Sequence, residues 1–170
     1  MNIKIIGAIL VIAGCGGFGF KLAATHLREE STLRQLISAL DYMACELQYR
    51  LTPLPQLCRQ AGQESKGIIS YVFLALSEEL EGQISPDAER CMSAALCRVK
   101  DLPRLSRNAI ESLGHSLGRF DIEGQLKGLE AVRQECRRNL ELLNQNRETR
   151  LRSYQTLGLC AGAAIAILLI

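Results

Sequence analysis

Apolar residues recur at intervals of three and four along the middle of the chain. The clearest stretch contains Leu33, Leu36, Ile37, Leu40, Met43, Ala44, Leu47 and Leu51. Side chains at this spacing share one face of an α-helix and can be buried together. The pattern predicts a helix that ends at Thr52-Pro53, where Thr52 caps and Pro53 opens the next helix.

The same spacing predicts further helices over residues 54–62, 68–80, 85–99 and 103–118. Residues 68–73 alone resemble a strand, but the continuation to Leu80 is long and rich in helix formers. Gly82 is the expected C-cap of that helix, and Ser85-Pro86 is expected to open the next. No Asn-Gly or Asp-Gly dipeptide suggests a β-hairpin.

A sixth helix is predicted to begin at Asp121, whose carboxylate can cap it. Its inward positions are Ile122, Leu126, Leu129, Val132, Cys136, Leu140, Leu143 and Leu151. Neither Gly nor Pro interrupts Leu129 to Leu157, so this helix is expected to continue into the apolar carboxyl end. The fold class is therefore all-α, a six-helix bundle.

Both ends of the chain are poor in charge. Among 20 basic and 18 acidic residues, only Lys4 and Lys21 lie outside Arg28 to Arg152. A helix over residues 3–24 would be about 33 Å long, enough for a hydrocarbon layer of about 30 Å. We expect transmembrane helices at 1–26 and 153–170, flanking a helical domain at 27–152. More positive charges flank the inner sides of these spans, which predicts a domain facing the cytoplasm.

Glycines in these ends admit several interpretations. Gly158 and Gly162 form a G-x-x-x-G pair, which favours close packing of membrane helices. Residues 12–15 resemble a lipoprotein cleavage box, so the alternative is a lipoprotein anchored through Cys15 with an extracytoplasmic helical domain. Residues 14–19 also match G-x-G-x-x-G, but residues 36–40 offer no acid for a dinucleotide site.

Composition offers little chemistry. The net charge of +2, with bases interleaved among acids, argues against nucleic acid. Seven cysteines without C-x-x-C spacing fit free thiols in a reducing compartment. Because His26 and His115 are the two histidines, a zinc site is not expected. No catalytic motif is found, so we expect no enzyme, no cofactor, no metal and no small-molecule substrate.

Three local patterns, together with the paired apolar ends, resemble the stage III sporulation protein AB family over the whole chain. The first is YRLTPLP at 49–55, with Thr52 and Pro53. The second is LGRFDIEGQ at 117–125, which resembles the family's L-G-x-x-D-x-x-x-Q through Leu117, Gly118, Asp121 and Gln125. The third is YQTLG at 154–158.

This resemblance implies a function that composition does not show. The family belongs to the machinery of endospore formation, which builds a channel from the mother cell towards the forespore during engulfment. Its helical domain is similar to the cytoplasmic domains of type II secretion and type IV pilus platform proteins. The resemblance implies a place in the mother-cell membrane around the forespore. The implied partners are membrane lipid, other membrane proteins of the same operon and their cytoplasmic ATPase.

Overall fold

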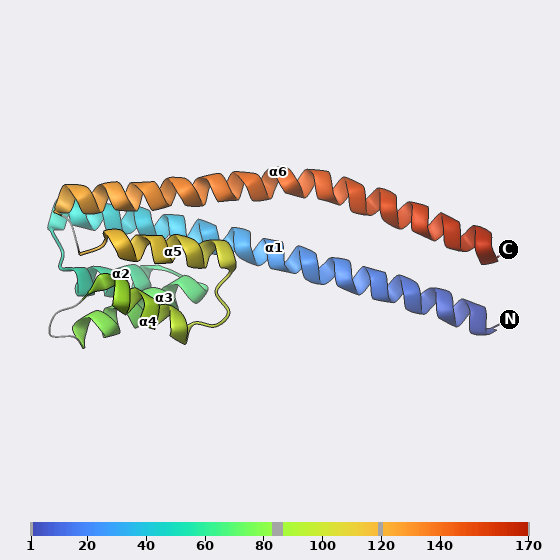
Figure 1. Cartoon of the computed structure of the whole chain (residues 1–170), viewed down its shortest axis with the longest axis horizontal. Coiled ribbons are helices and arrows are strands. Elements are labelled where there is room, and N and C mark those ends of the chain that lie inside the picture. Colours follow the sequence, from blue (N-terminus) through green and yellow to red (C-terminus); the bar gives the residue numbers. More distant parts are fainter. Residues whose placement is uncertain (1, 83–86, 119–120, 170) are drawn as a thin grey trace. The chain divides into compact units, whose positions relative to one another are not determined.

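The computed structural model describes the backbone of residues 2–82, 87–118 and 121–169, and the side chains of Thr25, 27–82, 87–118 and 121–145. Within these ranges the regular secondary structure is all helical and no strand is found, as the sequence predicted. The helices are α1 (Asn2–Arg50), α2 (Leu54–Glu64), α3 (Gly67–Glu81), α4 (Ala88–Arg98), α5 (Arg104–Ser116) and α6 (Ile122–Leu169) (Figure 1).

The chain divides into two compact units. Unit 1 comprises Met1–Leu27 and Glu141–Ile170, and unit 2 comprises Arg28–Leu140. Helices α1 and α6 each belong to both units, because neither is interrupted at the unit boundary. The prediction that the last helix continues into the apolar carboxyl end is confirmed.

The predicted membrane spans concern residues whose side chains are mostly outside the described part. No side chain of segment 153–170 is described, and of segment 1–26 only the Thr25 side chain is described. Among the described residues, no helix combines the length and apolar character needed to cross a membrane. The prediction of two transmembrane helices therefore stays a prediction.

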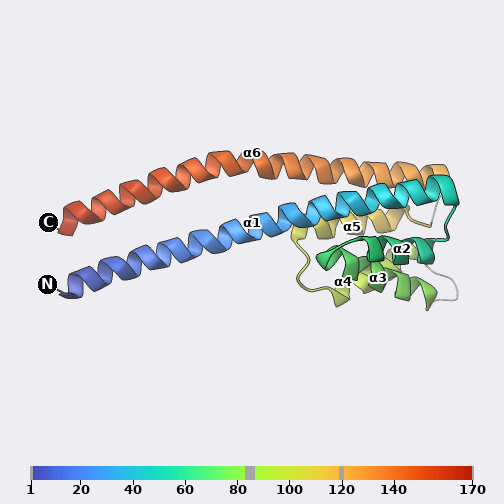
Figure 2. The ribbon, with the colours of Figure 1, turned by 180° about the vertical axis from the view of Figure 1, so that it is seen from behind.

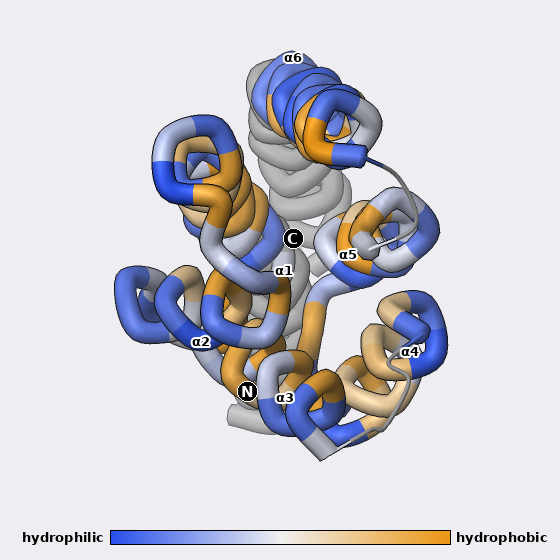
Figure 3. The backbone as a smooth tube through the Cα atoms, turned by 90° about the vertical axis from the view of Figure 1, so that its left-hand side faces the viewer, coloured by the Kyte–Doolittle hydropathy of each residue, from blue (hydrophilic) through white to orange (hydrophobic). Residues whose placement is uncertain are grey.

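Unit 2 is built around a core to which every helix contributes. Phe73 of α3 is completely buried, and the core also includes buried leucines of α1, α2 and α5. Figure 3 shows hydrophobic positions gathered between the helices, with hydrophilic positions outside. The fully buried large side chains are Phe73, Leu33, Leu36, Leu40, Met43, Leu57, Ile69, Leu76, Met92, Leu96, Ile110 and Leu113. The predicted inward faces are confirmed at these positions, because helical spacing alone decides which side chains share a face.

The helix starts agree with the sequence in part. Asp121 caps α6 as predicted, since its carboxylate accepts a hydrogen bond from the Gly124 amide at 2.9 Å. Thr52 does not cap α2: the N-cap residue is Pro53, and no side-chain bond is made there. The Thr52 hydroxyl instead bonds the Glu46 carboxylate at 3.3 Å. Helix α4 begins at Ala88, capped by Asp87, and the predicted opening at 85–86 lies outside the described residues.

Two predicted inward residues are exposed. Leu51 lies one residue past the end of α1 and has a left-handed φ of 53°, so it leaves the helical face and is 63% exposed. Ile122 is the first residue of α6 and is 43% exposed. Helix side chains lean towards the amino terminus, so a side chain in this position projects past the end of its helix.

Contacts distant in sequence hold the helices together. The Arg133 guanidinium of α6 binds the Asp41 carboxylate of α1 at 2.5 Å. The Glu29 carboxylate of α1 accepts a hydrogen bond from the Leu105 amide at 2.8 Å and so caps α5. Helices α1 and α6 run antiparallel within unit 2 (Figures 1 and 2), and the Asp41–Arg133 pair joins them.

Candidate functional site

Two chain reversals meet at one end of unit 2. One joins α1 to α2, and the other joins α5 to α6. A Cβ atom on Gly118 would lie 3.4 Å from Leu54 Cδ2 and 3.6 Å from Ala88 Cβ. We call residues 49–54 and 117–125 the turn end, with Arg119 and Phe120 outside the described residues. The turn end lies opposite the Arg28 and Leu140 limits of unit 2.

The turn end brings together the two sequence patterns at 49–55 and 117–125. Gly118 has a φ of 72°, a left-handed conformation that glycine adopts without strain. Leu117 is completely buried, and its amide bonds the Leu113 carbonyl at 3.1 Å as α5 ends. Gly118 therefore reverses the chain beside Leu54, the first residue of α2. The sequence alone could not predict that these two patterns lie close together, because they are far apart along the chain.

A nearly buried carboxylate supports the α1–α2 reversal. Glu46 is 8% exposed, although carboxylates are seldom buried unless paired. It accepts the Thr52 hydroxyl at 3.3 Å and lies 3.4 Å from the Arg50 guanidinium. The hydrogen bond from Thr52, which follows Leu51 in sequence, therefore stabilises the turn. The sequence pattern predicted a local cap role for Thr52, because its partner Glu46, six residues back, follows no capping pattern.

The α5–α6 reversal ends on a conventional helix start. The Gln125 amide bonds the Asp121 carbonyl at 2.9 Å, which closes the first turn of α6. Asp121 is exposed and Gln125 is partly buried. These positions place Asp121 as the cap and put Gln125 one turn later on the same helix. Their role as interaction residues stays a prediction, and Gly158, Gly162 and Cys15 lie outside the residues whose side chains are described.

Three large apolar side chains of the turn end face solvent. Tyr49 is 76% exposed, and Leu51 and Ile122 are also exposed. Tyr49 and Leu51 frame the end of α1, while Ile122 opens α6. The sequence pattern assigned Leu51 and Ile122 to the core because periodicity contains no information on where a helix stops.

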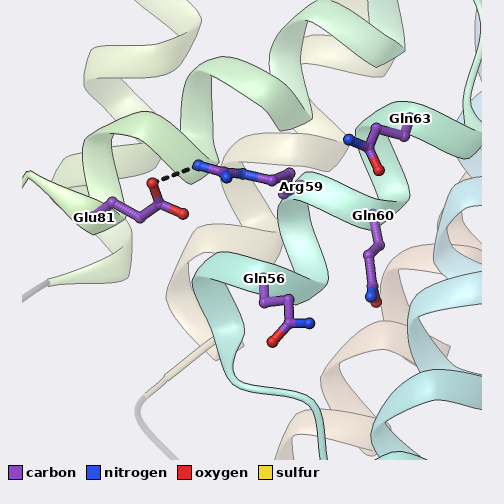
Figure 4. Close-up of a pocket in the computed structure, with 5 residues that line it drawn as sticks. All are labelled: Gln56, Arg59, Gln60, Gln63 and Glu81. Atoms are coloured by element: carbon purple, nitrogen blue, oxygen red, sulfur yellow. Dashed lines mark hydrogen bonds and ion pairs between the residues drawn. The ribbon is translucent and has the colours of Figure 1, made fainter.

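A polar hollow lies on another side of unit 2. It has a volume of about 410 Å³ and is lined by α2 and by Glu81 of α3. Figure 4 shows the Arg59 side chain reaching Glu81, with which it pairs at 2.5 Å. The other lining residues are Gln56, Gln60 and Gln63. Amide side chains and a paired charge offer hydrogen bonds here but no nucleophile.

The described cysteines are free thiols. Cys58, Cys91 and Cys136 are buried, whereas Cys45 and Cys97 are exposed. Burial raises the pKa of Cys58 to about 12, so this thiol stays protonated near neutral pH. Within the described ranges, no group of three or more His, Cys, Asp or Glu side chains is placed to hold a metal ion.

A family model supplies the decisive comparison. The model for stage III sporulation protein AB matches residues 4–170. The chain belongs to the stage III sporulation protein AB family. The resemblance seen in the sequence is thereby confirmed, and with it a place among sporulation proteins.

Individual members of the family agree with this assignment. Stage III sporulation protein AB of Bacillus subtilis (strain 168) is 25% identical over 170 residues, which cover 98% of this chain and 99% of that protein. A solved structure of a stage III sporulation protein AB has a TM-score of 0.63 at 22% identity, covering 72% of this chain and 98% of that chain. The comparison with the solved structure supports the helical fold of this chain.

Proposed function

We propose that this protein is a membrane-anchored component of the sporulation channel between mother cell and forespore. In this role it couples a cytoplasmic ATPase to the other membrane proteins of the complex and performs no catalysis of its own. It lies in the mother-cell membrane around the forespore, with unit 2 in the cytoplasm. The proposal adds membrane anchoring and ATPase coupling to the family assignment.

The observation that carries the proposal is the continuity of α1 and α6. Each helix contributes to the core of unit 2 and continues, without a break, into an end of the chain that is poor in charge. Ser153 to Ile170 carries no charged residue, and Lys4 and Lys21 are the only ones before Arg28. Helices satisfy their own backbone hydrogen bonds, so apolar helical ends suit a bilayer.

The architecture of unit 2 supports an interaction role. Its interior is filled by aliphatic side chains and Phe73, and its hollow is lined by glutamines and an ion pair. At the turn end, by contrast, apolar side chains are exposed. Exposed apolar residues on a small domain are a common feature of protein–protein contacts.

Membrane extraction and protease protection test the anchoring. After alkaline carbonate washing of membranes from sporulating cells, the full-length chain should remain in the pellet. External protease on protoplasts should leave unit 2 intact, and protease on opened vesicles should digest it. Release by carbonate would contradict the anchors. Digestion from outside, abolished by Cys15→Ser, would favour the lipoprotein alternative.

Co-purification tests the coupling separately. The full-length protein, tagged and crosslinked in sporulating cells, should retain the cytoplasmic ATPase encoded with it. Purified ATPase should also bind the full-length protein in lipid nanodiscs, and empty nanodiscs are the control. Stable membrane association without ATPase binding in either experiment would refute the coupling and leave the anchoring intact.

A further inference from the structure

Exposed cations lie at the end of unit 2 from which α1 continues towards the amino terminus. Two of them are placed by a single contact, because the Leu105 amide donates a hydrogen bond to the Glu29 carboxylate at 2.8 Å. Arg28 directly precedes Glu29 on α1, and Arg104 directly precedes Leu105 on α5. The start of α5 therefore brings a second exposed arginine to the Arg28 limit of unit 2.

A third cation, Lys100, lies on the loop between α4 and α5. The Arg107 guanidinium of α5 donates hydrogen bonds to the Leu96 carbonyl at 3.3 Å and to the Val99 carbonyl at 2.8 Å, which holds this loop beside the start of α5. Lys100 directly follows Val99 and is exposed. We call residues 28–29 and 99–107 the basic end.

Positive charge exceeds negative charge at the basic end. Its cations are Arg28, Lys100, Arg104 and Arg107 and its acids are Glu29 and Asp101, which gives a net charge of +2. Within the described part of the chain, Arg28, Lys100 and Arg104 make no ion pair and no side-chain hydrogen bond. These three side chains are therefore available to an anionic ligand.

The acids near these cations leave most of the positive charge uncompensated. The Glu29 carboxylate is directed at the first turn of α5, where it accepts the Leu105 amide. Glu30, just outside the basic end, pairs with Arg34 at 2.9 Å, so the two add no net charge. Asp101 is exposed on the loop and is the acid that opposes the three exposed cations.

The position of the basic end along α1 indicates which anion it meets. Arg28 follows Lys21 by seven residues of one uninterrupted helix, a rise of about 10 Å. Lys21 marks the border of the charge-poor end that we propose to lie in the bilayer. The Debye length is also about 10 Å at an ionic strength of about 0.1 M, so charge at that border still acts on Arg28. Anionic lipids supply negative charge at the cytoplasmic surface of a membrane.

We propose that the basic end rests on the phosphate groups of anionic lipids at the membrane surface. This inference rests on the proposed function, in which α1 anchors the chain and brings the membrane surface to this end of unit 2. The contact adds attraction to the anchors and holds unit 2 in one orientation, with the turn end away from the lipid.

Hydrogen–deuterium exchange of the full-length protein in nanodiscs tests the contact. One set of nanodiscs contains phosphatidylcholine alone, and the other contains phosphatidylcholine with anionic phosphatidylglycerol. Amides 99–102 should exchange about fivefold more slowly over the anionic lipid, because each Lys or Arg near such a surface strengthens attachment by about that factor. Sodium chloride at about 1 M shortens the Debye length to about 3 Å and should remove the difference.

A triple variant identifies the side chains responsible. With Arg28→Ala, Lys100→Ala and Arg104→Ala combined, amides 99–102 should exchange at the same rate over both lipids. Because the three side chains are exposed and make no printed contact with the core, the unfolding midpoint should stay close to that of the unchanged protein.

A second triple variant is the matched control. It combines Arg50→Ala, Arg90→Ala and Lys127→Ala, which removes the same charge from exposed positions outside the basic end. The lipid dependence of amides 99–102 should remain in this variant.

The outcomes separate the inference from the proposed function. Equal exchange over the two lipids in the unchanged protein, or equal loss of the lipid dependence in both triple variants, would overturn the lipid contact and leave the anchoring intact. If the first triple variant does not fold, the salt dependence of the unchanged protein decides the result, and a difference that persists in about 1 M salt contradicts the contact. If the full-length protein does not assemble into nanodiscs of either lipid, the anchoring and the inference both fail.

Discussion

At Gly128, helix α6 has no room for a side chain. A Cβ atom there would lie 2.3 Å from Ser116 Cβ and 2.5 Å from its Oγ. Gly128→Ala should therefore force α5 and α6 apart and lower the free energy of unfolding by about 1–3 kcal/mol. Urea unfolding followed by circular dichroism measures the change.

Gly82→Ala is the matched control for this substitution. Gly82 has a φ of −75°, and a Cβ atom would meet the Glu78 carbonyl oxygen at 3.4 Å, an ordinary contact. The free energy of unfolding of the Gly82→Ala variant should stay within about 0.5 kcal/mol of that of the unchanged protein. Equal stability of the two variants would show that α5 and α6 adapt to the extra methyl group at no cost.

The buried thiols should differ from the exposed ones in their chemistry. Burial raises the pKa of Cys58 and of Cys136 from 9.0 to about 12. At pH 8, iodoacetamide should modify Cys45 and Cys97 in the folded protein and spare Cys58 and Cys136, as mass spectrometry of peptides would show. Because the thiolate is nucleophilic and the thiol is not, equally fast labelling of Cys58 would contradict its burial.

The same shift gives the sign of a pH dependence. The pKa of these thiols is higher in the folded chain, so their protonated form favours folding. The contribution of these thiols to the free energy of unfolding should be fully present below about pH 9 and should fall as the pH rises towards 12. Replacing Cys58 by Ser would remove part of this alkaline loss.

At the scale of the helix, Glu29 shows why some features were beyond prediction. Its carboxylate caps α5 across 76 positions of sequence. Capping patterns are local, so they could identify Asp121, three residues before the amide it binds, but not Glu29. The predicted cap role of Thr52 was wrong for the same reason, because its hydroxyl binds Glu46 on the preceding helix. Helical faces were predicted well because periodicity is also local, and the meeting of Gly118 with Leu54 was not.

Removal of this long-range cap should destabilise α5. Glu29→Ala leaves the Leu105 amide without its acceptor and should lower the free energy of unfolding by about 1 kcal/mol. Glu29→Gln keeps an acceptor oxygen and should lose less. Arg34→Ala is the control, since its pair with Glu30 is an exposed one of spacing four, worth about 0.5 kcal/mol at most. A loss as large in Arg34→Ala would mean that the effect comes from α1 itself.

At the scale of the whole molecule, unit 2 has what an independent domain requires. Its core includes Phe73 and side chains from every helix, and the Asp41–Arg133 pair joins its first and last helices. None of these contacts involves residues of the charge-poor ends, 1–26 and 153–170. The proposed membrane anchors would therefore position this domain without being needed for its fold, which agrees with a role in holding a partner at a membrane.

A fragment of residues 27–152 should accordingly fold alone. We expect a monomer in size-exclusion chromatography with light scattering, a helical circular dichroism spectrum, and one cooperative unfolding transition. The fragment with Asp41→Ala and Arg133→Ala together should unfold earlier but remain helical, because a partly exposed ion pair contributes about 1 kcal/mol or less. A fragment with substantial sheet, or one that unfolds without a cooperative transition, would show that the core depends on the ends of α1 and α6. In that case the ends would contribute to folding as well as to anchoring.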